Sequence, residues 1–318
     1  MKFYLPANFN FISFQSVLFR KFLMPRAQTG ISPLPPKNAL ILSFRVDDLP
    51  LKAMSLGHIA ANIPGLVNEM RTSASGSDLL YSIGFGSLLW NFIWQGNMPP
   101  GFRPLEIDEE NDEDEDEMSS GSDLTFCFFS SNTNLLHQLA EESQVHLKNI
   151  AAVNEIVFAN LVQDQKSNNP VEDEKTTTSV LIDKKYPEFA QSSFLCTLGL
   201  TDNSKTNTIL SPAEREALSQ NLAKVFHSLT AKESGLLHHL YSWQTENERG
   251  HYLLAMSNRV DPFQNILDAV LTSSADSLQI GNVDITPALY FLPSLEILAA
   301  LRMGTLRIGP LSPTAKWK

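Results

Sequence analysis

The stretch LTFCFFSSNTNLLHQLAEES at residues 124–143 follows the same plan as GHYLLAMSNRVDPFQNILDAVL at residues 250–271. Each begins with an apolar run of strand length, passes through a polar Ser/Asn turn and ends in an amphipathic helical pattern. Asn132 or Thr133 can cap the first helix, and Asp261, followed by Pro262, can cap the second. The repetition predicts a duplicated unit in which an apolar strand leads into a helix.

The rest of the chain extends this pattern to an α+β fold. Strands are predicted at residues 38–46, 154–162, 192–200 and 236–243, and helices at 51–71 and from Ser211 to about Thr230. The helix after Asp261 is expected to bury Phe263, Ile266, Leu267, Val270 and Leu271. Strands and helices in this order favour antiparallel sheets with helices packed on their outer faces.

The acidity of the chain is confined to one segment. Ten of the 35 acidic residues lie between Glu106 and Glu117, which leaves 25 acids against 24 bases and changes the net charge from -11 to -1. We therefore interpret residues 106–118 as a solvated acidic loop inside a nearly neutral protein. No basic stripe remains that would indicate nucleic-acid binding.

Several compositional features limit the class of protein. No run of about 18 apolar residues is present, so no membrane span is expected. Residues 1–26 lack a secretory cleavage pattern and are interpreted as an extension or a misassigned start, which predicts a cytoplasmic protein. Cys127 and Cys196 stand in apolar runs typical of buried core thiols, and no CxxC or HExxH spacing indicates zinc.

Three segments resemble the dye-decolorising (DyP-type) haem peroxidases. They are AQTGISPLPPKNALILSFRV (27–46), YSIGFGSLLWNFIWQGNMPPGFRPL (81–105) and DITPALYFLPSLEIL (284–298), the last after the 250–271 stretch. The resemblance implies two ferredoxin-like halves, as in a dimeric α+β barrel, with haem b against the second. The expected division is a first half at 27–162, a linker at 163–178 and a second half at 179–318.

The residues that the resemblance assigns to peroxide chemistry are altered in this chain. The family carries Gly-x-x-Asp-Gly before an Asn-Pro, which here is Asn169-Pro170. Counting back places Gln165 at the position of the aspartate, and the two glycines become Val162 and Lys166. A glutamine cannot accept the peroxide proton as a carboxylate does, so neighbouring Asp164 is the remaining candidate.

For the iron ligand, the resemblance points to His227, with His238 or His239 as fallbacks. A haem iron of this type needs a neutral imidazole. His238 and His239 alternate along one predicted strand, so only one of them can face a given pocket. The distal arginine of the family has no counterpart before Arg249, which is interpreted as a turn residue at the start of a strand.

Three functions follow from these observations. The first is a DyP-type peroxidase that uses hydrogen peroxide to oxidise a small organic donor, with a homo-oligomer as a possible state. The second is a degraded relative that binds haem, or serves regulation or assembly, without efficient turnover. The third is an interaction module that uses the acidic loop for recognition.

Overall fold

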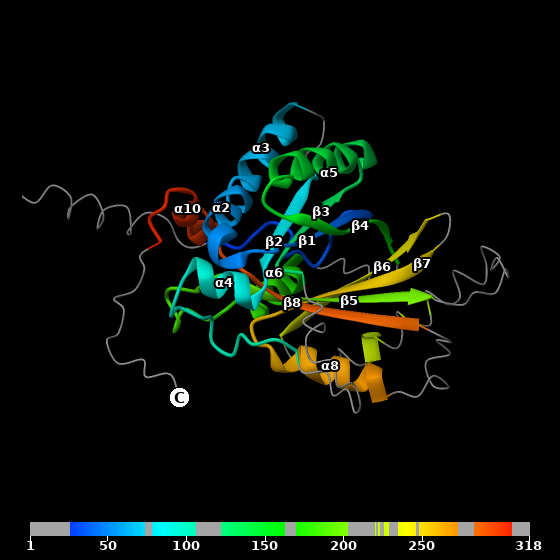
Figure 1. The fold of residues 1–318 in the computed structure, drawn as a ribbon. Coiled ribbons are helices and arrows are strands. Elements are labelled where there is room, and N and C mark those ends of the chain that lie inside the picture. Colours follow the sequence, from blue (N-terminus) through cyan, green and yellow to red (C-terminus); the bar gives the residue numbers. More distant parts are fainter. Residues whose placement is uncertain are drawn as a thin grey trace, which may run out of the picture.

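Eight antiparallel strands of the described chain close into one barrel (Figure 1). The computed structural model describes residues 26–73, 78–105, 122–162, 170–202, 220, 222, 226–228, 235–245, 248–272 and 283–306. The strands are β1 (Asn38–Arg45), β2 (Leu80–Phe85), β3 (Leu124–Ser130), β4 (Ala152–Leu161), β5 (Ser193–Asp202), β6 (Leu236–Gln244), β7 (Arg249–Ser257) and β8 (Val283–Leu292). The predicted α+β fold with antiparallel strands is therefore confirmed, and its strands close into one barrel.

The barrel consists of two strand groups with the same internal order. Around the barrel the strands run β1-β3-β2-β8-β5-β7-β6-β4. The first group thus reads β4-β1-β3-β2 and the second reads β8-β5-β7-β6. When the strands of each group are numbered in chain order, both groups run fourth, first, third, second. The duplication predicted from residues 124–143 and 250–271 corresponds to this repeated order, because the two stretches form the third strand of each group and the helix that follows it.

The two groups join along narrow seams. β2 pairs with β8 only at Phe85 and Phe291, and β4 pairs with β6 only over residues 159–161. At the first seam, a Cβ on Gly84 would lie 2.7 Å from Tyr290 Cβ, so the glycine permits the close approach of β2 to β8. This requirement explains the first glycine of the Gly84-Phe85-Gly86 motif.

Helices cover the outer face of each strand group, as Figure 1 shows. Over the first group lie α2 (Leu49–Ala60), α3 (Ile63–Ser73), α4 (Ser87–Ile93), α5 (Thr133–Leu147) and α10 (Leu295–Arg302). α8 (Asp261–Thr272) covers the second group, and α6 (Pro170–Ser179) contacts β6. α6 occupies most of the predicted linker at 163–178. Within the described residues, no helix combines the length and the apolar character needed to cross a bilayer.

Pro64 divides the helix that was predicted at 51–71. The structure has two helices there, because Pro64 is the second residue of α3, where a missing backbone N–H costs nothing. Pro50 occupies the corresponding early position in α2. The prediction of one continuous helix was therefore wrong.

Two other helical predictions can be compared with the structure. Asn132 caps α5 by accepting a hydrogen bond from the backbone N–H of Asn134, as expected. In α8 four of the five predicted core residues are buried, but Leu271 is 45% exposed and that part of the prediction was wrong. The helix predicted from Ser211 to about Thr230 lies mostly outside the described residues, although 226–228 are helical.

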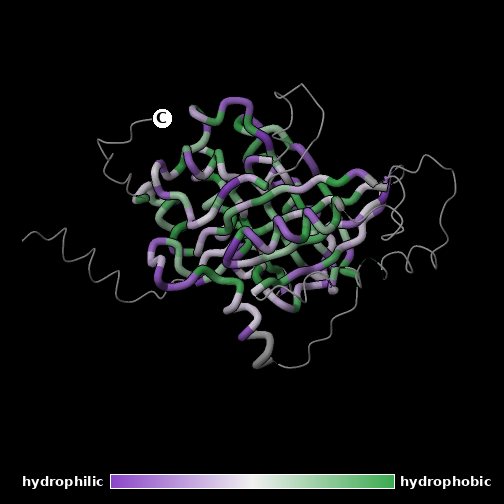
Figure 2. Tube along the Cα trace, turned by 90° about the horizontal axis from the view of Figure 1, so that it is seen from below, coloured by the Kyte–Doolittle hydropathy of each residue, from purple (hydrophilic) through white to green (hydrophobic). Residues whose placement is uncertain are grey.

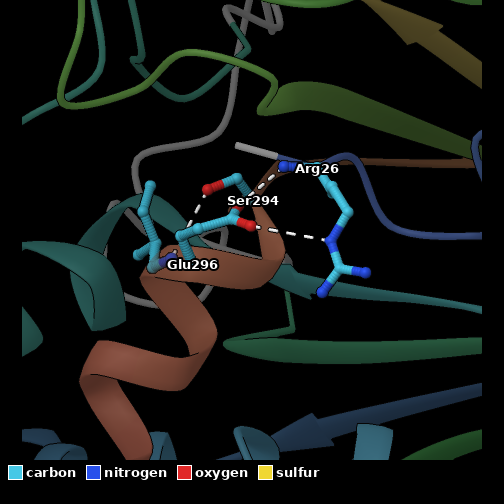
Figure 3. Close-up of polar contacts among 4 residues, drawn as sticks. Arg26, Ser294 and Glu296 are labelled. Carbon is cyan, nitrogen blue, oxygen red and sulfur yellow. Dashed lines mark hydrogen bonds and ion pairs between the residues drawn. The ribbon is translucent and has the colours of Figure 1, made fainter. Parts of the chain in front are cut away.

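The start of α10 is fixed by the YFLPSLE stretch. Ser294 is the N-cap and its hydroxyl accepts a hydrogen bond from the backbone N–H of Ile297 (Figure 3). Glu296, in the first turn, accepts a hydrogen bond of 2.7 Å from the backbone N–H of Arg26 and forms an ion pair with its guanidinium (Figure 3). The carboxylate also suits the positive end of the helix dipole. These contacts tie residue 26 to the far end of the described chain.

The apolar residues form three clusters that follow the barrel geometry. The largest lies mainly between the first strand group and its helices, extends onto β5, β7 and β8 of the second group, and includes the fully buried Trp90, Phe126 and Phe291. A second fills the barrel interior, with residues of both groups such as Phe129 and Tyr241. Figure 2 shows the same pattern, with hydrophobic segments concentrated among the central strands. The third cluster lies under α8 and is described next.

Candidate functional site

The third apolar cluster covers the outer face of the second strand group. We call it the outer cluster; its buried members are Leu198, Leu200, Leu222, Phe226, Leu240, Leu253, Ile266, Leu267 and Val270. Strand alternation places His238 and Ser242 on the same face as Leu240, and His251 on the same face as Leu253. The register sets His238 opposite Ala255 and His251 opposite Ser242. Two histidines of the sheet therefore stand on the face that α8 covers.

His227 is brought to the same face from the helical residues 226–228. Its neighbour Phe226 is buried in the outer cluster, whereas His227 itself is exposed. The imidazole rings of His227 and His238 lie with their centres 6.3 Å apart and their planes tilted by 44°. We call these two residues the histidine pair. The structure thus brings together the first candidate ligand and one of its two fallbacks.

Burial keeps the sheet member of the pair uncharged. Desolvation, and secondarily the charge of nearby His227, lowers the pKa of His238 from 6.5 to about 4. An imidazole with this pKa is neutral at pH 7, which is the form that ligates metal ions. The donor set of the pair therefore fits a haem iron chemically.

His239 lies on the opposite face of β6, as the alternation predicted. Its Nε2 lies 2.8 Å from the backbone carbonyl oxygen of Ser32 and it is 7% exposed. Desolvation lowers the pKa of His239 to about 4, against the opposing effect of that hydrogen bond. A neutral His239 donates this hydrogen bond, so the residue holds the segment around Ser32 against the barrel.

The cysteines do not supply a thiolate ligand. Both are buried and unbonded to another sulfur, as the sequence predicted for core residues. Burial raises the pKa of each thiol to about 12. Within the described residues, no group of three or more His, Cys, Asp or Glu side chains could hold a metal ion.

The segment assigned to peroxide chemistry starts beside the histidine pair. Asp164, Gln165 and Lys166 lie outside the described residues, so their positions remain predictions. Val162 is described: its backbone N–H donates a hydrogen bond of 2.8 Å to the carbonyl oxygen of Leu240, two residues from His238. Its side chain packs against the outer cluster.

The acidic loop also starts near this face. Leu105, the last described residue before the loop, packs against the outer cluster and against the cluster of the first strand group. The chain is described again from Ser122, where Asp123 accepts a hydrogen bond from the backbone N–H of Val46. The start of the acidic loop therefore lies against the outer cluster that surrounds the histidine pair, although the two are far apart in the sequence.

Arg249 begins β7, as expected, and is paired with Gln244 in the register. It shares the outer face with His238, but Gln244 is six residues from His238 along β6. At about 3.3 Å per residue this separation is about 20 Å. An arginine there is too far from the histidine pair to stabilise charge beside it.

Two features were missed by the sequence reasoning. The first is His251, which the alternation His251-Leu253-Ala255 on β7 could have placed on the outer face. The second is a hydrogen bond inside the barrel, from the Tyr252 hydroxyl on β7 to the Glu155 carboxylate on β4. Desolvation raises the pKa of Glu155 and, with the Glu155 charge, also that of Tyr252. Because this pair joins the two strand groups, no local pattern could have found it.

Comparison with known proteins identifies the fold. No family model matches the sequence, and no curated protein matches it. A putative DyP-type peroxidase from Shewanella oneidensis is 15% identical with a TM-score of 0.66, over 87% of this chain and 98% of that one. DyPB from Rhodococcus jostii RHA1 is 16% identical with a TM-score of 0.64, over 87% of this chain and 98% of that one.

Two further structures extend this likeness. The encapsulated DyP-type peroxidase from Mycobacterium smegmatis is 16% identical with a TM-score of 0.65, over 86% of this chain and 98% of that one. A variant of the Rhodococcus protein, solved in complex with heme, is 16% identical with a TM-score of 0.66, over 86% of this chain and 98% of that one. The chain therefore has the fold of the DyP-type peroxidases along most of its length, which confirms the resemblance at the level of the fold.

Proposed function

We propose that this chain is a divergent DyP-type haem protein in which His227 ligates the haem iron. The observation that carries the proposal is the histidine pair, which stands on the outer face of the second strand group in a chain with the DyP fold. The Rhodococcus relative, of the same fold, has been solved in complex with heme. On this proposal the outer cluster excludes water from one side of the group that His227 holds.

The activity we propose is the oxidation of a small organic donor by hydrogen peroxide. Haem would supply the redox chemistry of the iron. His227 would hold the group in place, and Asp164, or a water near Gln165, would accept the proton of peroxide. We also propose haem b, a cytoplasmic location and two ferredoxin-like halves divided near residues 163–178, a division that the repeated strand order supports.

A second candidate is a relative that binds haem without efficient turnover. Two observations favour it: glutamine stands at the position of the family's aspartate, and Arg249 is about 20 Å along the sheet from His238. Peroxide cleavage would then lack both its proton acceptor and its stabilising cation. Such a protein would serve haem handling, regulation or assembly.

A haem titration tests the proposal. Haemin is added to the purified full chain and to His227→Ala, and the Soret band is followed. We expect stoichiometric uptake by the parent and a loss of affinity of at least about tenfold in the variant. His146→Ala removes an exposed histidine of α5 and should bind haem like the parent. No uptake by the parent contradicts the proposal, and uptake without peroxide-dependent dye oxidation selects the second candidate.

A further inference from the structure

The outer face of β4 carries three apolar side chains that remain exposed. Val153, Ile156 and Phe158 stand opposite residues of β1 that the helices of the first strand group bury, so they share that outer face. They are nevertheless 40%, 40% and 36% exposed. α5 packs chiefly on β1 and β3, and its His137 stacks on Phe158 with the ring centres 4.2 Å apart. We call the three exposed side chains the β4 stripe.

One edge of β4 lacks a partner strand beside the same residues. β1 pairs with β4 along nearly its whole length, whereas β6 pairs with it only over residues 159–161. On the side that faces away from β1, residues 152–158 pair with no strand of the described chain. The position that β6 would occupy if it continued along β4 is therefore open to another strand.

The direction of the backbone groups shows which residues offer hydrogen bonds at this edge. Leu161 donates its backbone N–H toward β1, to the carbonyl oxygen of the residue before that strand, whereas Val162 donates its N–H to β6. These directions alternate along a strand, so the N–H and C=O groups of Ile156 and Phe158 point away from β1, as those of Val162 do. The residues that present apolar side chains thus also present unpaired backbone groups.

β4 has few of the features that protect an exposed strand edge. Its sequence, AVNEIVFANL, contains no lysine and no proline. Its one charged residue, Glu155, is held inside the barrel by the hydroxyl of Tyr252. Apolar edges without charges are commonly covered by another segment in native proteins. The chemistry fits an extended, uncharged and apolar segment that adds a strand through backbone hydrogen bonds.

The chain itself contains a segment of this chemistry. Residues 7–19 read ANFNFISFQSVLF, which has no charge and no proline and is rich in residues that favour strands. The described chain begins at Arg26, which is held at the start of α10, over the same strand group as β4. From Phe14 to Arg26 an extended chain spans up to about 40 Å, close to the diameter of about 45 Å expected for a domain of this size. The segment is therefore long enough to reach β4.

We propose that residues 7–19 dock on β4 as an added strand beside residues 152–158, with their aromatic and aliphatic side chains on the β4 stripe. A second copy of the chain fits this edge less well, because each copy would bring its own β6–β7 hairpin to the same side of β4. The segment then belongs to the folded protein and is no misassigned start. This inference does not depend on haem.

Hydrogen–deuterium exchange of the full chain without haem tests the proposal. A triple variant, Phe9→Ser with Phe11→Ser and Phe14→Ser, keeps the length of the chain and removes the apolar side chains of the segment. Peptides that cover residues 154–161 should exchange at least about tenfold faster in this variant than in the parent. Peptides of β3 should exchange equally slowly in both, which shows that the barrel is folded. Equal exchange of residues 154–161 in the two proteins overturns the proposal.

The reciprocal change is made on β4. Ile156→Asp places a charge in the β4 stripe and should speed exchange within residues 7–19 by a similar factor. The matched control Leu51→Asp places the same charge on α2, at a leucine that is 81% exposed, and should leave both segments as in the parent. Protection of β4 that rises with protein concentration and persists in the triple variant would assign the edge to a second copy and overturn the proposal.

Discussion

The outer faces of the two strand groups share one strand order but carry different side chains. On the first group, β2 and β3 present Tyr81, Ile83, Phe85, Leu124, Phe126 and Phe128 to the helices. On the second, β6 and β7 present His238, Leu240, Ser242, His251, Leu253 and Ala255 at corresponding places. The duplicated strand order therefore carries one face used for packing and one face that holds polar side chains among apolar ones.

The most damaging change should be in the face used for packing. Phe126 is fully buried and its ring centre lies 5.3 Å from that of Phe44. Phe126→Ala should lower the free energy of unfolding by about 3–5 kcal/mol, since it removes a large side chain and leaves a cavity. Urea denaturation measures this loss. The folded fraction should bind haem with unchanged affinity; a fall in that affinity would break the division between the two faces.

The next largest effect is the pH-dependent stability that His239, the neighbour of His238 on β6, contributes. The pKa of His239 is about 4 in the folded chain and 6.5 when unperturbed, so the unfolded chain binds more protons between these values. Stability is therefore fully present above about pH 6.5 and falls as the pH drops to about 4, by about 3 kcal/mol for this residue. His239→Gln keeps a donor for the Ser32 carbonyl but cannot titrate.

Urea midpoints measured from pH 7 to pH 4 for the parent and for His239→Gln check this prediction. The carboxyl groups that also titrate in acid are the same in both proteins. The difference between their urea midpoints therefore reports the contribution of His239. The variant should lose less stability than the parent over this range. Parallel curves would show that His239 is not held neutral inside the barrel.

A smaller effect tests how the two strand groups are joined. Tyr252→Phe removes the hydroxyl that donates to Glu155 across the barrel and should cost about 1–3 kcal/mol, because a carboxylate that is partly desolvated loses its donor. Glu155→Gln should cost less, since it retains an acceptor. The double variant should be less destabilised than the sum of the single variants, and strict additivity would argue against this link.

The smallest effect is expected at Arg249. Arg249→Ala should change the haem affinity less than about twofold and should leave the spectrum of the bound haem unaltered, because the residue is about 20 Å along the sheet from His238. Haemin titration with absorption spectra checks this expectation. A change of spin state in this variant would show that Arg249 acts on the bound haem. It would contradict the separation of Arg249 from the histidine pair.

The strands and the α8 helix could be predicted because their patterns are local. Alternation along residues 236–243 was sufficient to place His238 and His239 on opposite faces, and an Asx cap was sufficient to start α5 at Asn132. Closure of the barrel was implied only by the family resemblance and could not be predicted from local patterns, since each seam rests on a few pairs between distant strands, such as Phe85 with Phe291. The approach of His227 to His238 depends on how a helical segment packs over a sheet, which no spacing in the sequence encodes.

Hydrogen–deuterium exchange of the full chain with and without haemin tests the central claim most directly. The claim is that haem binds on the outer face of the second strand group and not on that of the first. We predict that haemin slows exchange in the peptides that cover residues 226–228 and β6, and leaves α2, α4 and α5 unchanged. Slower exchange confined to the helices of the first strand group, or no change in either group, would contradict the account.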